Sequence, residues 1–178
     1  MDGLQPMQWA DFKHGGVRYD LSHLHPRTLK FERAAESEKP AIVYTVDVIF
    51  SIHCFSHRLP AGEYDRRLAY SDARETRLFD FDRYELSKRL PEIIETMAQR
   101  KCLHTGHGNF VTVEVVAKDG SSVNYHVFFT ASKSDRKGRV NLYIQSAYVP
   151  DKKVGNSGKP IRFLVILHNT LNRLTIRG

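Results

Sequence analysis

The sequence predicts a single α+β domain in which an antiparallel sheet of about five strands packs against one main helix. The first observation is a series of three strand-like runs within residues 109–147, which predicts a meander of antiparallel strands. The second is a helical spacing of apolar residues at about 91–101, directly before these runs, with a short helix ahead of it. The third is the length of 178 residues, which is typical of one domain with its own apolar core.

The meander has the clearest strand pattern in the chain. In its first run, alternate residues from Phe110 to Val116 face one side, and the valines between them face the other. Turn formers at Asp119 and Gly120, and again at residues 135–138, join consecutive runs as antiparallel hairpins. A sheet with one apolar face needs a cover, so we expect the helix before the meander to pack on it.

The helical segment carries its own start signal. Asp82 and Glu85 have the spacing of a helix-capping box. The apolar residues that follow lie on one helical face: Leu86, Leu90, Ile93, Ile94 and Met97. Because proline fits the first turn of a helix and breaks its interior, Pro91 predicts that a short helix ends there and that the main helix begins.

Other segments complete the expected domain. Residues 41–57 are rich in β-branched and aromatic side chains, which predicts a central strand covered on both faces. Asp47 lies within this run and must be paired or lie at a rim, because burying an unpaired carboxylate is costly. Residues 161–167 favour another strand, although their length does not exclude a helix. We expect an irregular lead-in at 1–16 and a basic loop at 149–160.

Charge and composition narrow the classes of function. The net charge is +7 and the isoelectric point is about 9.5, which favours a phosphate-rich partner, with an ordinary basic protein as the alternative. No segment is long and apolar enough to span a membrane, and the N-terminus lacks a secretion signal, so we expect a cytoplasmic protein. Two cysteines, Cys54 and Cys102, are too few for a disulfide scaffold and are expected to be free.

Polar side chains at the two ends of the meander are candidates for chemistry. His104 and His107 precede its first strand, and the glycines beside His107 would expose an imidazole that transfers protons near neutral pH. Ser146 and Tyr148 end its third strand and point to one face. These hydroxyls would hold a phosphate or stabilise developing charge. The alternative is that they pack and hydrogen-bond locally.

Arginines and aromatic residues alternate between residues 63 and 83. Arginine forks match phosphate oxygens, and aromatic faces stack on bases. An equal alternative is a solvated loop in which the arginines pair with neighbouring acids, namely Asp65, Asp72, Glu75, Asp80 and Asp82. The candidate nucleic-acid contacts are Arg74, Arg77 and Arg83, together with Lys133, Arg136 and Lys137 in the second turn of the meander.

No cofactor is expected, and zinc is the alternative. The ligand types that zinc prefers occur at His53, His57, Cys102 and His104. Their spacing matches no familiar zinc finger, and adjacent His53 and Cys54 would face opposite ways on a strand. The chain also lacks a Gly-rich phosphate loop, a Gly-x-Ser-x-Gly nucleophile motif and a His-Glu-x-x-His motif.

The order of elements from Asp82 to Tyr148 is a helix followed by a three-stranded meander that ends in Ser-Ala-Tyr. This order resembles the barnase/EndoU/colicin/RelE-like group of toxin endoribonucleases. The resemblance implies metal-independent RNA cleavage by 2′-hydroxyl attack on the adjacent phosphorus. It implies His107 as acid or base, with His104 or His126 as its partner. It further implies phosphate contacts from Ser146 and Tyr148, and charge compensation by Arg74, Arg77 and Arg83.

The leading functional prediction is therefore a cytoplasmic endoribonuclease of toxin or mobile-element type, with RNA favoured over DNA as the partner. One alternative is a non-catalytic RNA- or DNA-binding module. Another is a phage or defence accessory protein whose basic surface binds an acidic protein, and an inhibitor protein is a further expected partner. No membrane partner is expected.

Overall fold

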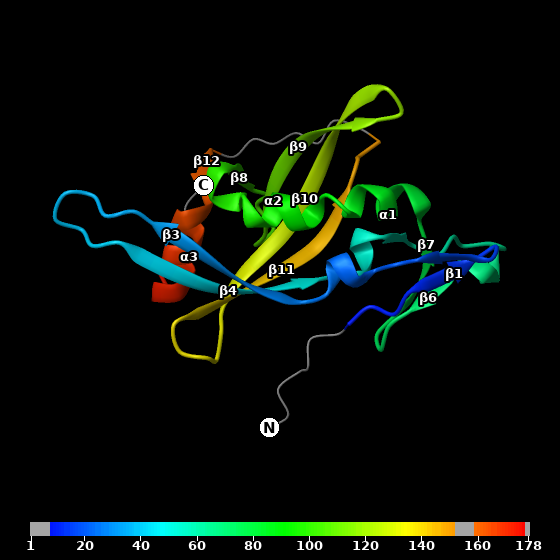
Figure 1. The fold of residues 1–178 in the computed structure, drawn as a ribbon, viewed down its shortest axis with the longest axis horizontal. Helices are drawn as coiled ribbons and strands as arrows, with labels where there is room; N and C mark the ends of the chain where they lie inside the picture. Colours follow the sequence, from blue (N-terminus) through cyan, green and yellow to red (C-terminus); the bar gives the residue numbers. More distant parts are fainter. Residues whose placement is uncertain (1–7, 152–158, 177–178) are drawn as a thin grey trace.

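The computed structural model describes residues 8–151 and 159–176, and its main feature is a curled sheet of seven strands (Figure 1). The strands lie in the order β12-β8-β9-β10-β11-β4-β3. Their bounds are β3 (Arg27–Arg33), β4 (Ile42–Phe50), β8 (Lys101–His104), β9 (Phe110–Lys118), β10 (Ser121–Lys133), β11 (Arg139–Tyr148) and β12 (Pro160–Arg162). Neighbouring strands are antiparallel except β11 and β4, which are parallel.

The mixed α and β character and the meander are confirmed, but the predicted five-strand sheet on one main helix is wrong. The meander is β9, β10 and β11, and Asp119 and Gly120 both adopt positive φ in its first turn. The sheet is larger because β3 and β8 join it. Both strands are charged or short, so neither has the apolar density that indicates a strand in sequence.

The predicted main helix at about 91–101 is shorter and begins earlier. The chain forms α1 (Phe81–Ser87), then α2 (Leu90–Glu95), then the 3-10 turn η4 (Met97–Gln99), and β8 starts at Lys101. Asp80, and not Asp82, caps α1, because its carboxylate accepts a hydrogen bond from the Arg83 amide at 3.0 Å. Pro91 lies in the first turn of α2, as expected.

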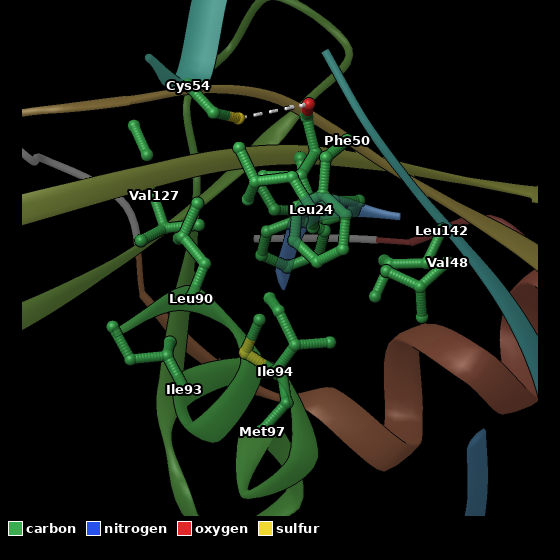
Figure 2. Packing of buried hydrophobic residues seen from close by; sticks show 14 of the residues in the cluster. Leu24, Val48, Phe50, Cys54, Leu90, Ile93, Ile94, Met97, Val127 and Leu142 are labelled. Atoms are coloured by element: carbon green, nitrogen blue, oxygen red, sulfur yellow. Dashed lines mark hydrogen bonds between the residues drawn. The ribbon is translucent and has the colours of Figure 1, made fainter. Parts of the chain in front are cut away.

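One face of the sheet is covered by α2 and by α3 (Phe163–Asn172). Figure 2 shows apolar side chains of α2 and η4 directed at those of the sheet. The side chains labelled there include Leu90, Ile93, Ile94, Met97, Val48, Phe50, Val127 and Leu142, all buried. Burying each large apolar side chain contributes about 1.5–3 kcal/mol, so this layer supplies much of the folding free energy.

The strand favoured at residues 161–167 is mostly a helix, which corrects that prediction. After the short edge strand β12, α3 buries Phe163, Ile166 and Leu167, the spacing of one helical face. Val165 points outward and is 45% exposed. The helix continues through polar residues to Asn172, so the apolar run was only its first half.

Strand β4 is covered on one face only, contrary to the expected burial on both. Its even-numbered residues from Tyr44 to Phe50 are buried, and the residues between them are partly exposed. The expectation for Asp47 is confirmed, because its carboxylate accepts hydrogen bonds from Arg139 and from Thr28. Burial alone would raise the pKa of Asp47, but these hydrogen bonds outweigh it and lower the pKa.

A second, small sheet lies beyond one end of the large one (Figure 1). It consists of β5 (Ser56–His57), β7 (Thr76–Phe79) and β6 (Ala69–Ser71), in that order. Three 3-10 turns are also present: η1 (Ser22–Leu24) precedes β3, η2 (Ile52–Cys54) lies between β4 and β5, and η3 (Arg66–Leu68) directly precedes β6. No described helix has the length and apolarity needed to cross a membrane.

The expected irregular lead-in contains a hairpin strand. Residues 1–7 lie outside the described part, but β1 (Phe12–His14) pairs with β2 (Val17–Tyr19). The Phe12 ring stacks on Phe79 of the small sheet, with ring centres 4.0 Å apart. Trp9 packs edge-on against Phe55, with ring centres 5.3 Å apart. This aromatic packing fixes the hairpin to the small sheet.

Candidate functional site

Hydrogen-bonded polar side chains gather where the small sheet meets α1 and the end of β11. We name this group the junction cluster. Its members are His53, Ser56, His57, Glu75, Arg77, Asp80 and Arg83. They come from η2, β5, β7 and α1 and from the residues just before β7 and α1. Elements distant in sequence therefore bring the cluster together.

The first pair in the cluster is His53 with Glu75. The His53 imidazole donates from Nε2 to Glu75 Oε1 at 2.7 Å, and both side chains are partly exposed. This hydrogen bond is the main cause of a lowered pKa for Glu75, which remains ionised at neutral pH. The second oxygen of Glu75 accepts from Arg77 at 3.2 Å.

Arg77 is held rigidly. Only 9% of the residue is exposed, and its Nε donates to Ser56 Oγ at 2.9 Å. The Ser56 hydroxyl in turn donates to the Ile52 carbonyl at 2.6 Å. A buried guanidinium needs such acceptors, because an unpaired buried charge is costly. Arg77 therefore presents a fixed positive charge beside the His53–Glu75 pair.

The second pair is His57 with Asp80, joined to the first by Arg83. His57 Nδ1 donates to Asp80 Oδ2 at 3.1 Å. Arg83 Nη1 donates to the carbonyls of His53 at 3.2 Å and of Ser56 at 2.9 Å, which fixes the chain between the two histidines. The Arg83 guanidinium also lies over the Tyr148 ring, 4.9 Å from its centre.

An open hollow adjoins the cluster. Its volume is about 640 Å³, and its lining residues are Arg58, Leu59, Pro60, Ala61, Glu75, Thr76 and Arg77. Two arginines and one carboxylate thus face the same space. A phosphate group entering it would meet Arg58 and Arg77, with Glu75, the hydrogen-bond partner of His53, at its wall.

This arrangement is suited to acid-base chemistry on an anionic substrate. An imidazole oriented by a carboxylate can take or give a proton near neutral pH. Within the described ranges, no group of three or more histidine, cysteine, aspartate or glutamate side chains is arranged to hold a metal ion. The four residues of the zinc alternative fall into two sets: His53 and His57 belong to the cluster, and Cys102 and His104 to β8.

Several of the sequence candidates meet at the junction cluster. Arg77 and Arg83 belong to it, and Tyr148 contacts it through Arg83. The acid-pairing alternative applies to part of this segment, because Arg67 pairs with Asp65 at 2.8 Å. Arg74 is exposed and, within the described residues, its guanidinium has no acidic partner.

His104 and His107 lie elsewhere. The His104 ring packs edge-on against Phe110, 5.2 Å away, on the helix-covered face of the sheet. His107 is exposed in the turn before β9. Strand β8 is three positions from β11 in the sheet, roughly 14 Å at the usual strand spacing. The His104 imidazole therefore does not meet Tyr148.

His126 and Ser146 lie on the same sheet face as Tyr148, the face opposite α2 and α3. His126 is the register partner of Tyr148, and Ser146 that of Phe128. Only 5% of His126 is exposed, and burial lowers the pKa of its imidazole. Lys133, Arg136 and Lys137 are exposed at the β10–β11 turn, at the opposite end of β11 from Tyr148.

Sequence reasoning missed Ser56, Glu75 and Asp80 as members of a site. The sequence suggests the two acids only as partners of arginines, and nothing in it indicates that histidines 22 and 23 residues away are their partners. One other serine–histidine contact is structural. Ser87 Oγ lies 2.7 Å from His23 Nε2 but is fully buried, so no substrate can reach it.

Both expected free cysteines are confirmed, and both are buried. Burial raises the pKa of the Cys54 thiol and of the Cys102 thiol to about 12. Neither thiol is therefore ionised at neutral pH, and neither has the character of a reactive nucleophile.

Comparisons with known proteins cover nearly the whole chain. A family model described as the YjaZ family matches residues 11–171. The curated protein named Protein YjaZ, from Escherichia coli strain K12, is 30% identical over 169 residues, which are 92% of this chain and 91% of that protein. No solved structure matches. The matched region contains the junction cluster and the complete meander.

Proposed function

This chain belongs to the YjaZ family, and we propose that it is a metal-independent endoribonuclease centred on the junction cluster. The observation that carries the proposal is the combination of two histidine–carboxylate pairs with two fixed arginines. Two members of this group, Glu75 and Arg77, also line the open hollow. The expected cytoplasmic location belongs to the same proposal, because RNA is present there.

The reaction needs a base and an acid. The base removes the proton of the ribose 2′-hydroxyl, the oxygen attacks the adjacent phosphorus, and the acid protonates the leaving 5′-oxygen. His53 and His57 supply two imidazoles within five residues, each held by a carboxylate. We assign the base and acid roles to these two residues as a pair.

The arginines would stabilise the negative charge that develops on the phosphoryl group. Negative charge grows on the phosphoryl oxygens in the transition state, and fixed donors stabilise it without reorganising. Arg77 is fixed by Ser56 and Glu75, and Arg83 by two backbone carbonyls. The earlier candidates His107, His104, His126 and Ser146 remain predictions, but within the described residues they do not combine with fixed arginines in this way.

The test is cleavage of a labelled RNA in EDTA by the purified protein. His53→Ala is expected to lower the rate on the order of 10²–10⁴-fold, the usual cost of losing an acid or base. His107→Ala is the matched control, because it removes an exposed imidazole outside the cluster; it should cleave at the wild-type rate.

Two outcomes would contradict this assignment. Intact RNA at high wild-type concentration would reject the nuclease. Loss of cleavage in His107→Ala, with His53→Ala unaffected, would move the centre to the start of the meander.

A non-catalytic nucleic-acid-binding module is the second candidate. The observation that favours it is the exposure of Arg66 and Arg74, whose guanidinium groups have no acidic partner in the described part of the chain. Tyr64, two residues before Arg66, is 37% exposed. Arg74→Glu is then expected to weaken binding to all RNA sequences alike and to reduce its salt dependence. Filter binding over a salt series measures this.

An unchanged affinity and salt slope in this variant would show that residues 63–83 do not contact the nucleic acid. The absence of any binding at low salt would favour an acidic protein as the partner.

A further inference from the structure

A row of side chains crosses the face of the large sheet opposite α2 and α3. We name it the cross-strand row: Arg162, Lys101, Val113, His126 and Tyr148, from β12, β8, β9, β10 and β11. Arg162 pairs with Lys101, Val113 with His126, and His126 with Tyr148. Lys101 joins the row because it lies two residues before Leu103, which pairs with Val111 on the same face.

Aromatic rings form a surface along part of this row. Phe128, two residues from His126, stacks on Tyr148 with ring centres 5.5 Å apart and planes 19° apart. Both rings are partly exposed. The Arg83 guanidinium contacts the same Tyr148 ring at 4.9 Å, so the row adjoins the junction cluster.

The other end of the row is cationic. Lys101 and Arg162 are direct cross-strand partners and both are exposed. Like charges placed opposite each other repel. Within residues 8–151 and 159–176, neither side chain has an acidic partner. An anion bound between them would relieve this repulsion.

His126 provides an independent indication of a ligand. Only 5% of the residue is exposed, and its Nδ1 has no hydrogen-bond partner among the described residues. Buried polar atoms are nearly always paired, so this atom lacks the partner that a bound polar group would supply. It lies in the row between the cations and the aromatic rings.

From these observations we infer that the cross-strand row binds single-stranded nucleic acid, with bases on Phe128 and Tyr148 and phosphates at Lys101 and Arg162. This inference deepens the proposed function, on which it rests for the substrate class, by naming the single-stranded form. A duplex keeps its bases stacked inside, whereas a single strand offers them to aromatic side chains. Through Arg83, a strand on the row extends toward the junction cluster.

The experiment measures binding separately from cleavage. A fluorescent single-stranded DNA oligonucleotide serves as the probe, because it lacks the 2′-hydroxyl and cannot be cut by the proposed reaction. Fluorescence anisotropy is recorded for the single strand and for the same sequence as a duplex, over a salt series. The wild type is expected to bind the single strand at least about 10-fold more tightly than the duplex.

Matched variants locate the binding surface. Lys101→Glu is expected to weaken binding about 10-fold and to lower the salt slope by roughly one contact. Lys30→Glu changes the charge equally at the far edge strand β3, and should bind like the wild type. Tyr148→Leu is expected to lose on the order of 10-fold in affinity, while Tyr148→Phe, which keeps the ring, retains it.

Three results would overturn the inference: equal affinity for single strand and duplex, equal effects of Lys101→Glu and Lys30→Glu, or the absence of any binding to nucleic acid at low salt. Thermal melting of each variant shows whether a loss of binding comes from unfolding, and the Tyr148→Phe variant keeps the test decisive. Row-dependent binding by a protein that leaves RNA intact supports the row and rejects only the nuclease.

Discussion

Arg77 illustrates, at the scale of the residue, how this fold retains a charge in its interior. The residue belongs to β7, the middle strand of the small sheet, and its Nε and Nη1 donate to Ser56 and Glu75. Leaving a buried donor unpaired costs about 1–3 kcal/mol, so these partners decide whether the guanidinium can remain buried. The same hydrogen bonds that stabilise the buried guanidinium also hold it where Arg77 lines the hollow.

Two histidines, the partly buried His23 and the buried His126, predict a loss of stability in mild acid. Burial lowers the pKa of both His23 and His126 below the usual histidine value of 6.5. The unfolded chain therefore binds protons at these sites more readily than the folded one. Their contribution is fully present above about pH 6.5 and is lost as the pH falls through the lower folded-state pKa values. We expect the urea concentration at the midpoint of unfolding to decrease as the pH is lowered from about 7.5 to about 5.5.

The control for this prediction uses another histidine. His126→Leu removes one titrating group and should flatten the pH dependence of the free energy of unfolding, whereas exposed His107→Ala should leave its slope unchanged. The pKa values of Asp47 and Glu75 are lowered, so these carboxylates titrate below this pH range and do not contribute to the change in stability within it. A urea midpoint constant across the window would show that neither histidine couples to folding.

At the scale of the element, α3 is the clearest case in which local pattern was insufficient. Its apolar residues are contiguous at the start, so they read as a short strand, and its polar half follows as an apparent tail. What decides the matter is tertiary: Phe163 packs on Phe31 and Phe129 of the sheet, with ring centres 5.1 and 6.0 Å away. Propensity is overridden by the surface that the helix covers.

Phe163 tests the role of α3 as a cover. Phe163→Ala removes a fully buried ring and is expected to lower the free energy of unfolding by about 3–5 kcal/mol. Val165→Ala, on the exposed side of the same helix, should change it by less than about 0.5 kcal/mol. Urea unfolding followed by circular dichroism measures both. Similar values for the two variants would mean that α3 does not dock as described.

The meander could be predicted because its information is local. Alternation and turn residues define β9, β10 and β11 without reference to other segments. The strands β3 and β8 could not be found in this way, since Lys30, Glu32 and Lys101 give them a polar composition. Their place in the sheet comes from neighbours distant in the chain.

At the scale of the whole molecule, the candidate site joins parts that no sequence window contains. Arg77, Arg83, Tyr148, His53 and His57 were each singled out from the sequence, but in different roles. Their meeting depends on the small sheet docking against α1 and the end of β11. Residue types could be predicted, whereas this docking could not, because hydrogen bonds such as His53–Glu75 leave no periodic trace.

The parallel pairing of β4 with β11 has a consequence for synthesis on the ribosome. The two strands meet across about 90 residues, as the Asp47–Arg139 contact at a separation of 92 shows. While the intervening chain is translated, β4 waits with one edge unsatisfied, and such an edge is open to pairing with other chains. The sheet is completed only after β11 has left the ribosome, so folding depends on a strand that is synthesised late. The nascent chain is therefore most prone to aggregation midway through translation.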